Sequence, residues 1–122
     1  MRGIFVNSDG VKYAEAIVGG YKTIETRNRD MLRSLIGERV AVVRTGCKKK
    51  PTVIGYVHID FALFLRRDEV AAASDRTLIP EGSKYDCTGR GKWCYFLSEP
   101  QECEPYPLPD NAIRHGRSWC EF

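Results

Sequence analysis

The sequence predicts an α+β domain whose β-sheet closes, or nearly closes, into a barrel. Three observations lead to this prediction. Several short segments rich in valine, isoleucine and aromatic residues follow residue 38. One segment with helical spacing lies near the N-terminus, and only short helical inserts separate the later strands. Because the chain has 122 residues, of which 43% are hydrophobic, we expect one domain over residues 1–122.

The N-terminal elements are a strand and a helix. Residues 2–6 are expected to form the first strand. Ser8 or Asp9 then offers a side-chain oxygen that can accept a free backbone N–H at the start of a helix. Ala14 and Val18 lie one helical turn apart, which places both on one face. These residues therefore predict a helix soon after the first strand.

Glycines mark the ends of two helical segments. The pair at residues 19–20 ends the first helix, because glycine adopts the left-handed conformation at low cost. Residues 22–27 are short and mixed in character, and we expect them to be extended. Residues 29–36 predict a second short helix, which Gly37 ends.

Strands dominate from residue 39 onward. Residues 39–45 are rich in valine, and residues 52–61 alternate, with Val53, Ile59 and Phe61 on one face. The opposite face of this second segment is mostly polar, so we expect it to be partly exposed to water. The remaining predicted elements are one or two helical turns over 67–74, a long loop over 75–91, and strands over 93–97, 103–108 and 118–122.

Charge and cysteine content limit the classes of protein. The net charge of +3 permits nucleic-acid binding without requiring it. The five cysteines are odd in number and form no Cys-x-x-Cys pair, and the N-terminus lacks the apolar run of a signal peptide. We therefore expect a cytoplasmic protein with free thiols. No stretch approaches the ~20 apolar residues of a membrane span, so we expect no membrane partner.

A zinc site is the weaker interpretation of the cysteines. Cys87, Cys94 and His115 are ligand types that zinc accepts, but the paired short spacings of structural zinc sites are missing. Buried thiols explain these cysteines better. We expect neither a metal nor an obligatory cofactor.

The most informative local segment covers residues 20–27, Gly-Tyr-Lys-Thr-Ile-Glu-Thr-Arg. If it is extended, Thr23, Glu25 and Arg27 point the same way, and Lys22 lies at the corner where helix becomes strand. An ammonium, a carboxylate and a guanidinium could then converge. Arginine offers a planar set of donors that suits a phosphate or a base edge, and glutamate can accept from an exocyclic amine.

The alternative for this segment is a solvated edge strand. In that case the Glu25–Arg27 pair would contribute little to stability, because exposed ion pairs are weak. Pattern alone slightly favours this alternative.

A family resemblance favours a functional site over a solvated edge strand for this segment. The helix ending in Gly-x-Lys-Thr-x-Glu-x-Arg resembles the signature of the ASCH domain, a relative of the PUA fold. Further similarities follow in the expected order along nearly the whole chain, and the ordered set is more specific than any one motif. They comprise residues 36–42, residues 54–59 with their glycine, residues 93–100, and the closing segment of Tyr106-Pro107-Leu108, Gly116 and Trp119.

The resemblance implies a PUA-like pseudo-β-barrel of five to six mostly antiparallel strands, with a cleft beside the first helix. It implies that Lys22, Glu25 and Arg27 face this cleft, and that the partner is RNA, other nucleic acid or a nucleotide. Some small members are amidohydrolases that act on N4-acetylcytidine through a lysine, a threonine and a glutamate. The lysine matches Lys22, whereas the position of the threonine carries Glu25 and Thr23 is only adjacent.

Two residues of the long loop extend the candidate site. Tyr85 is expected to face a ligand, because loops carry binding residues more often than strands do, and Lys84 beside it could meet a phosphate. The first hypothesis is a binding module for RNA or a modified nucleotide, formed by Lys22, Thr23 and the residues named above. The alternative is a small hydrolase, either an acylated-nucleoside amidohydrolase or a ribonuclease, with Lys22 and Glu25 as catalytic residues. A protein-docking domain ranks third.

Overall fold

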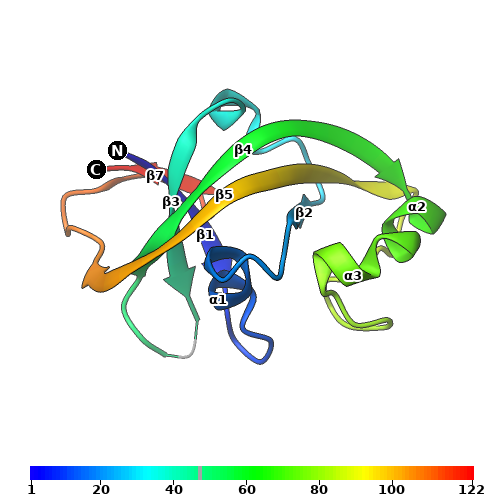
Figure 1. Ribbon diagram of the computed structural model, residues 1–122, viewed down its shortest axis with the longest axis horizontal. Helices are drawn as coiled ribbons and strands as arrows, with labels where there is room; N and C mark the ends of the chain where they lie inside the picture. Colours follow the sequence, from blue (N-terminus) through cyan, green and yellow to red (C-terminus); the bar gives the residue numbers. More distant parts are fainter. Residues whose placement is uncertain (47) are drawn as a thin grey trace.

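The computed structural model describes residues 1–46 and 48–122. Figure 1 shows the order of the elements along the chain. The N-terminal half contains β1 (Arg2–Asn7), α1 (Tyr13–Val18), β2 (Ile24–Arg27), the 3₁₀ helix η1 (Arg33–Leu35) and β3 (Arg39–Thr45). The C-terminal half contains β4 (Thr52–Arg66), α2 (Arg67–Ala72), α3 (Ser74–Thr77), β5 (Gly91–Pro107), β6 (Ile113–His115) and β7 (Trp119–Glu121).

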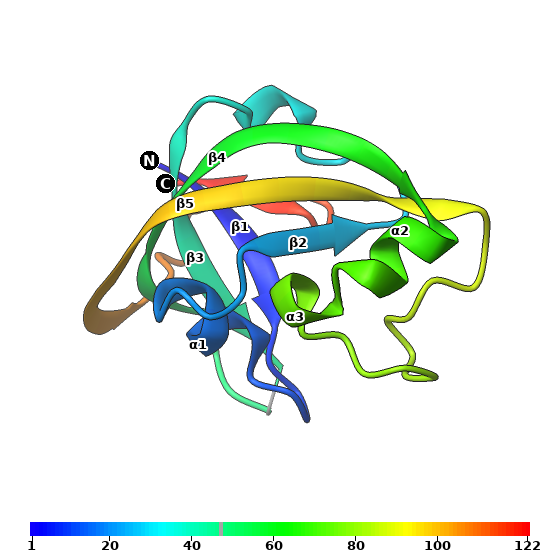
Figure 2. The same cartoon turned by 45° about the vertical axis from the view of Figure 1, so that its right-hand side comes forward.

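In the described residues, the strands form one seven-stranded sheet in the order β2-β5-β4-β3-β1-β7-β6. All neighbouring strands are antiparallel except β1 and β3, which run parallel. The predicted α+β class with a mostly antiparallel sheet is therefore confirmed. The sheet is strongly curved but open, with β2 and β6 at its two edges, and it has seven strands where five to six are predicted. Figure 2 shows β4 and β5 arching over β2 and α3.

The two longest strands exceed the predicted lengths. β4 continues to Arg66, and β5 joins two predicted strands into one. The connecting residues look like a turn in the sequence, because they include Pro100. In the structure they form an irregularity within β5, where Glu99 has φ of 52° and the register with β4 shifts. Bulges accommodate proline and an extra residue without ending a strand.

The main core lies between the sheet and α1. The helix contacts β1, β3, β4 and β5, and its apolar face joins the buried side chains of the sheet. Ser8 contributes as predicted to the start of the helix, since its Oγ accepts the N–H of Ala14 at 3.0 Å. The helix nevertheless begins at Tyr13, so Ser8 does not occupy the cap position itself. Gly20, with φ of 82°, turns the chain out of the helix toward β2.

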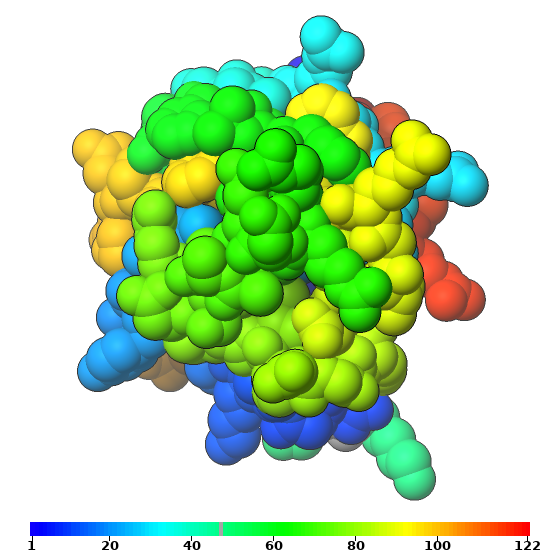
Figure 3. All heavy atoms as spheres, turned by 90° about the vertical axis from the view of Figure 1, so that its right-hand side faces the viewer, coloured from blue at the N-terminus to red at the C-terminus, as the bar shows by residue number. Residues whose placement is uncertain are grey.

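A smaller core lies at the far end of β4 and β5. It comprises Ile24, Val70, Cys87 and Cys94, from β2, α2, the loop before β5 and β5. Figure 3 shows α2, α3 and the following loop gathered on this face. These segments close one side of the molecule beside β2, which places the loop of residues 78–90 next to the predicted site. Within the described part of the chain, no helix combines the length and hydropathy needed to cross a membrane.

Candidate functional site

A pocket of about 480 Å³ opens between β1, β2, α1 and the loop that precedes β5. Tyr13 of α1 and Tyr85 of the loop supply aromatic walls, and their rings meet edge to face with centroids 5.7 Å apart. Polar side chains of β1 and β2 line the pocket together with Asn28, which directly follows β2. Its size and mixed lining are those of a site for a small organic molecule.

Positive charge dominates the described lining of this pocket. The cationic side chains come from β2 and the residues before it, from β5, from β6, and from the segment between β6 and β7. Five cations therefore face a single carboxylate, that of Glu25, which leaves four unbalanced positive charges if all are ionised. Such an excess favours an anionic ligand. The five are Lys22, Arg27, Lys92, Arg114 and Arg117.

A chain of ion pairs runs along the pocket wall. The carboxylate of Glu25 lies 3.7 Å from Nζ of Lys22 through Oε1 and 3.0 Å from Nη2 of Arg27 through Oε2. The same Nη2 donates to the backbone carbonyl of Phe5 at 2.7 Å, which ties β2 to β1. Glu25 is thus held from both sides, and its position in the pocket is fixed by its neighbours.

Local structure explains why these three side chains converge. After Gly20, the backbone N–H groups of Tyr21 and Lys22 both donate to the carbonyl of Ala16, which closes the helix end and sets the corner. Glu25 and Arg27 then lie two residues apart on β2. Because strand side chains alternate, both point to the same face of the sheet.

Lys22 is a buried cation with several partners. The residue is only 2% exposed, and Nζ donates to the backbone carbonyl of Thr77. The ammonium also lies 5.0 Å from the centre of the Tyr13 ring, within range of a cation–π interaction. Burial lowers the pKa of Lys22, and the nearby carboxylate of Glu25 partly opposes that shift. The lysine is therefore easier to deprotonate than a lysine in water.

A second buried lysine enters the pocket from β5. Lys92 donates from Nζ to the backbone carbonyl of Tyr85, which anchors the loop to the strand. Burial lowers the pKa of Lys92 as well. Arg114 and Arg117, in contrast, are exposed at the rim. The deep lysines are thus fixed by protein carbonyls, while the rim arginines are accessible to an incoming anion.

Solved structures with the same architecture include an ASCH protein from Zymomonas mobilis. Its crystal structure superposes with a TM-score of 0.70 and 21% sequence identity over 87% of this chain and 73% of that one. The chain has the ASCH fold. Two crystal structures of mutants of that protein match with TM-scores of 0.69, at 23% and 22% identity, over 87% of this chain and 74% and 76% of theirs. No protein-family model and no curated protein sequence matches the chain.

The ASCH fold brings four of the predicted site residues to one pocket. Lys22, Glu25, Arg27 and Tyr85 all line it. Thr23 lies outside the lining, and its Oγ1 instead accepts from Nε of Arg76 at 2.9 Å. That side chain precedes β2, so the alternation that orients Glu25 and Arg27 does not extend to it. The roles of these predicted site residues in binding or catalysis stay predictions.

Lys84 is placed beside the pocket without lining it. Its Nζ lies 5.0 Å from the centre of the Tyr85 ring, so the residue packs against a lining aromatic. Trp93 also lies outside the pocket lining, and its ring meets that of Phe64 edge to face at 5.7 Å.

Sequence reasoning missed Lys92 and Tyr13 as lining residues. A lysine between Gly91 and Trp93, in an otherwise apolar strand, is a signal for a buried charge with a specific partner. Its partner is a loop carbonyl, which no pattern of residue types identifies. Tyr13 lies on the apolar face of a helix, where the sequence pattern indicates a core residue and gives no sign of a pocket.

The cysteines that the structure describes are unpaired. Cys87, Cys94 and Cys120 are buried and Cys103 is partly buried. Cys47 lies outside the described residues. Among the described residues, no three histidine, cysteine, aspartate or glutamate side chains gather as a metal site would require. Burial raises the pKa of Cys94 to about 11, so its thiol is protonated at neutral pH.

Proposed function

We propose that the chain, as one domain, binds RNA by receiving a single nucleotide unit, natural or modified, in this pocket. The observation that carries the proposal is the ratio of five cationic side chains to one carboxylate around a space of about 480 Å³. A nucleotide combines an anionic phosphate with a flat base, which is the chemistry that a cationic pocket with aromatic walls accommodates.

The role of each residue depends on how deep it lies in the pocket. Arg114 and Arg117 lie exposed at the rim and contact phosphate. Glu25 accepts from an amino group on the base edge, because its two oxygens are held in place by Lys22 and Arg27. Tyr85 supplies the aromatic surface beside the base. RNA as the partner fits a cytoplasmic location, where the unpaired thiols of the described cysteines would stay reduced.

The test is fluorescence polarisation with a labelled single-stranded RNA over a series of salt concentrations. We expect the affinity of the Arg114→Ala, Arg117→Ala double variant to fall at least about tenfold at low salt. The slope of log affinity against log salt should shrink by about 0.7 for each lost phosphate contact. These arginines are exposed, so their removal leaves the core intact.

The double variant Arg33→Ala, Arg90→Ala is the matched control. Both residues are exposed and lie outside the pocket lining, so this variant removes the same two positive charges from other surfaces. RNA binding that weakens equally in the control and in the Arg114→Ala, Arg117→Ala variant would mean non-specific attraction, and would contradict the proposal.

A hydrolase is the second candidate, favoured by one observation. Lys22 is buried with a lowered pKa, and its ammonium lies 3.7 Å from the carboxylate of Glu25 inside the pocket. Such a pair can serve in acid–base catalysis. The same protein samples can be incubated with labelled RNA and with N4-acetylcytidine. If the wild type turns over a substrate and Lys22→Met does not, the hydrolase function is assigned. If the wild type shows no more turnover than Lys22→Met, the function is excluded.

A further inference from the structure

The distal half of β4 has a neighbouring strand on one side only. β3 pairs with β4 as far as His58, whereas β5 pairs with it through Phe61–Arg66 without a further register shift. Within the described residues, no strand pairs with the other edge of Phe61–Arg66. Figure 2 shows this part of β4 as the right-hand half of the arch, which leads into α2. Backbone groups that point away from β5 are therefore open to an added strand.

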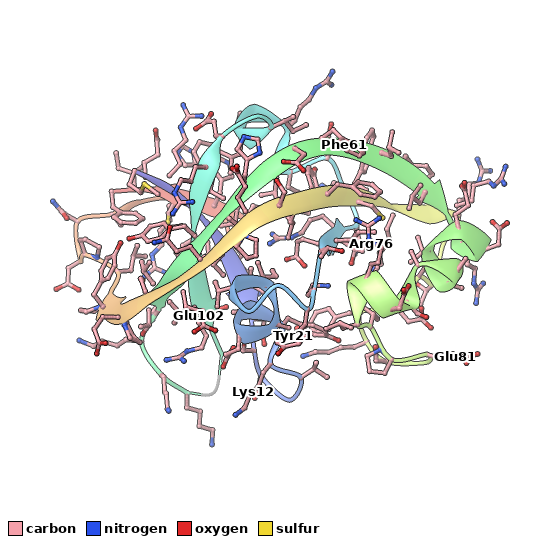
Figure 4. The ribbon with its side chains drawn as sticks, in the orientation of Figure 1. Lys12, Tyr21, Phe61, Arg76, Glu81 and Glu102 are labelled. Atoms are coloured by element: carbon pink, nitrogen blue, oxygen red, sulfur yellow. The ribbon has the colours of Figure 1, made fainter. Side chains whose placement is uncertain are left out.

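The same segment exposes apolar side chains on both of its faces. Phe61, Leu63 and Phe64 are 47%, 48% and 47% exposed, and they follow one another almost without interruption. Phe61 stacks on Phe96 at 4.5 Å, which fixes its ring at the surface, and Figure 4 places it on the arch of β4. An open edge with exposed apolar residues is a site for pairing with another chain.

We propose that a second copy of this chain pairs with β4 along Phe61–Arg66, antiparallel and across a two-fold axis at Leu63. The segment is complementary to itself in this register. Phe61 faces Leu65 of the partner subunit, and Leu63 faces its own copy. On the opposite face, Ala62 lies across from Phe64 of the partner subunit.

Charge complementarity selects this occupant and this register. Asp60 adjoins one end of the segment and Arg66 forms the other, so the two-fold axis brings each beside its opposite charge on the partner. Asp60 is held in place by the hydroxyl of Ser98, which donates at 2.6 Å, and by Nδ1 of His58 at 2.5 Å. Two aspartate–arginine pairs would thus flank an apolar centre.

The features at the two ends also limit the pairing to one segment. The register of β4 with β5 shifts between Ile59 and Phe61, and α2 begins at Arg67. Neither end can extend the ladder, so pairing closes on two copies and does not continue into a fibre.

Sedimentation equilibrium in reducing buffer tests the proposal, because the reductant excludes disulfide-linked dimers. We expect the wild-type chain to reach twice the mass of one chain as concentration rises. Leu63→Lys places two ammonium groups against each other at the axis, and should raise the dimer dissociation constant at least about tenfold. Ile113→Lys is the matched control, since Ile113 is also exposed but lies on β6 at the far edge of the sheet.

Charge reversal tests the register independently. Asp60→Arg alone and Arg66→Asp alone should each weaken the dimer, and the double reversal should restore it. A wild-type chain that stays monomeric at every concentration overturns the proposal. So does a Leu63→Lys dimer as tight as wild type, or an equal loss in Ile113→Lys, and failure of the double reversal overturns the register. Circular dichroism of each variant checks that the fold is retained.

Discussion

The carboxylate of Glu25 compensates two cations at once. Lys22 on one side is almost fully buried, and Arg27 on the other side also bonds to the carbonyl of Phe5. A buried charge without its partner is strongly unfavourable, because the low-dielectric interior replaces little of the lost hydration. The same contacts that orient the predicted site therefore contribute to the stability of this side of the molecule.

Replacement of Glu25 by glutamine removes the compensating charge while it keeps the shape. We expect Glu25→Gln to lower the free energy of unfolding at pH 7 by about 1–3 kcal/mol, measured by urea unfolding. The penalty should shrink as pH rises toward 10.5, because Lys22, whose pKa is lowered by burial, then loses its charge. Glu81→Gln, on the exposed loop labelled in Figure 4, is the control. A penalty that is unchanged across this pH range would show that the ion pair does not cause it.

The contact between α1 and β4 depends on Gly55, because glycine has no side chain. A Cβ built on Gly55 would lie 2.3 Å from the carbonyl oxygen of Gln101 and 2.6 Å from Cγ1 of Val18. Neither group can move easily, since one is strand backbone and the other is buried in the core. The glycine therefore lets the helix and two strands approach one another closely.

Gly55→Ala should consequently destabilise the protein by about 1–3 kcal/mol, as an overpacked core does. The displaced helix carries Tyr13 and leads into Lys22, so RNA binding should weaken in the same variant. Thermal unfolding followed by circular dichroism measures the first effect, and polarisation measures the second. Gly89→Ala is the control, because a Cβ there meets nothing within 4 Å. Equal melting temperatures for the two variants would contradict this account of the packing.

At the scale of elements, sequence patterns located most strands but not their irregularities. The valine-rich segment of β3 and the alternation in β4 come from burial on one face, which a pattern records directly. Phe61 was expected with the buried face, yet the register shift beside it turns its ring to the surface. Bulges depend on how two distant segments pair, so single-segment periodicity does not predict them. The short strand β6 is fully exposed and carries no alternation to detect.

The candidate site was predictable where its residues are close in sequence. Lys22, Glu25 and Arg27 come from one corner and one strand, so alternation and a family signature together identify them. Lys92 and Arg114 reach the same pocket only through the order of strands in the sheet. That order is a property of the whole chain, so local sequence patterns do not show that these cations share one pocket with Lys22 and Arg27.

For the molecule as a whole, the smaller core contains a titratable thiol. Cys94 packs with Ile24, Val70 and Cys87, and its burial raises the pKa of the thiol from 9.0 to about 11, although nearby Lys22 and Lys92 oppose the shift. The contribution of Lys22 and Lys92 to stability changes with pH in the opposite direction to that of the thiol. Burial lowers their pKa values, so their contribution to stability increases as pH rises toward 10.5.

Comparison of the wild type with Cys94→Ala isolates the thiol from these other groups. In the unfolded chain the thiol ionises near pH 9, whereas in the folded protein it stays protonated until about pH 11. Its contribution is therefore fully present below pH 9 and is lost as pH rises through the folded pKa, which amounts to about 3 kcal/mol for a shift of this size. Alanine cannot ionise and leaves a small cavity, so the variant should be less stable at pH 7.

The difference in unfolding free energy between the two proteins should then narrow by up to about 3 kcal/mol between pH 9 and 11, measured by urea unfolding in reducing buffer. A difference that stays constant across this range would mean that the folded protein does not hold the thiol in its neutral form.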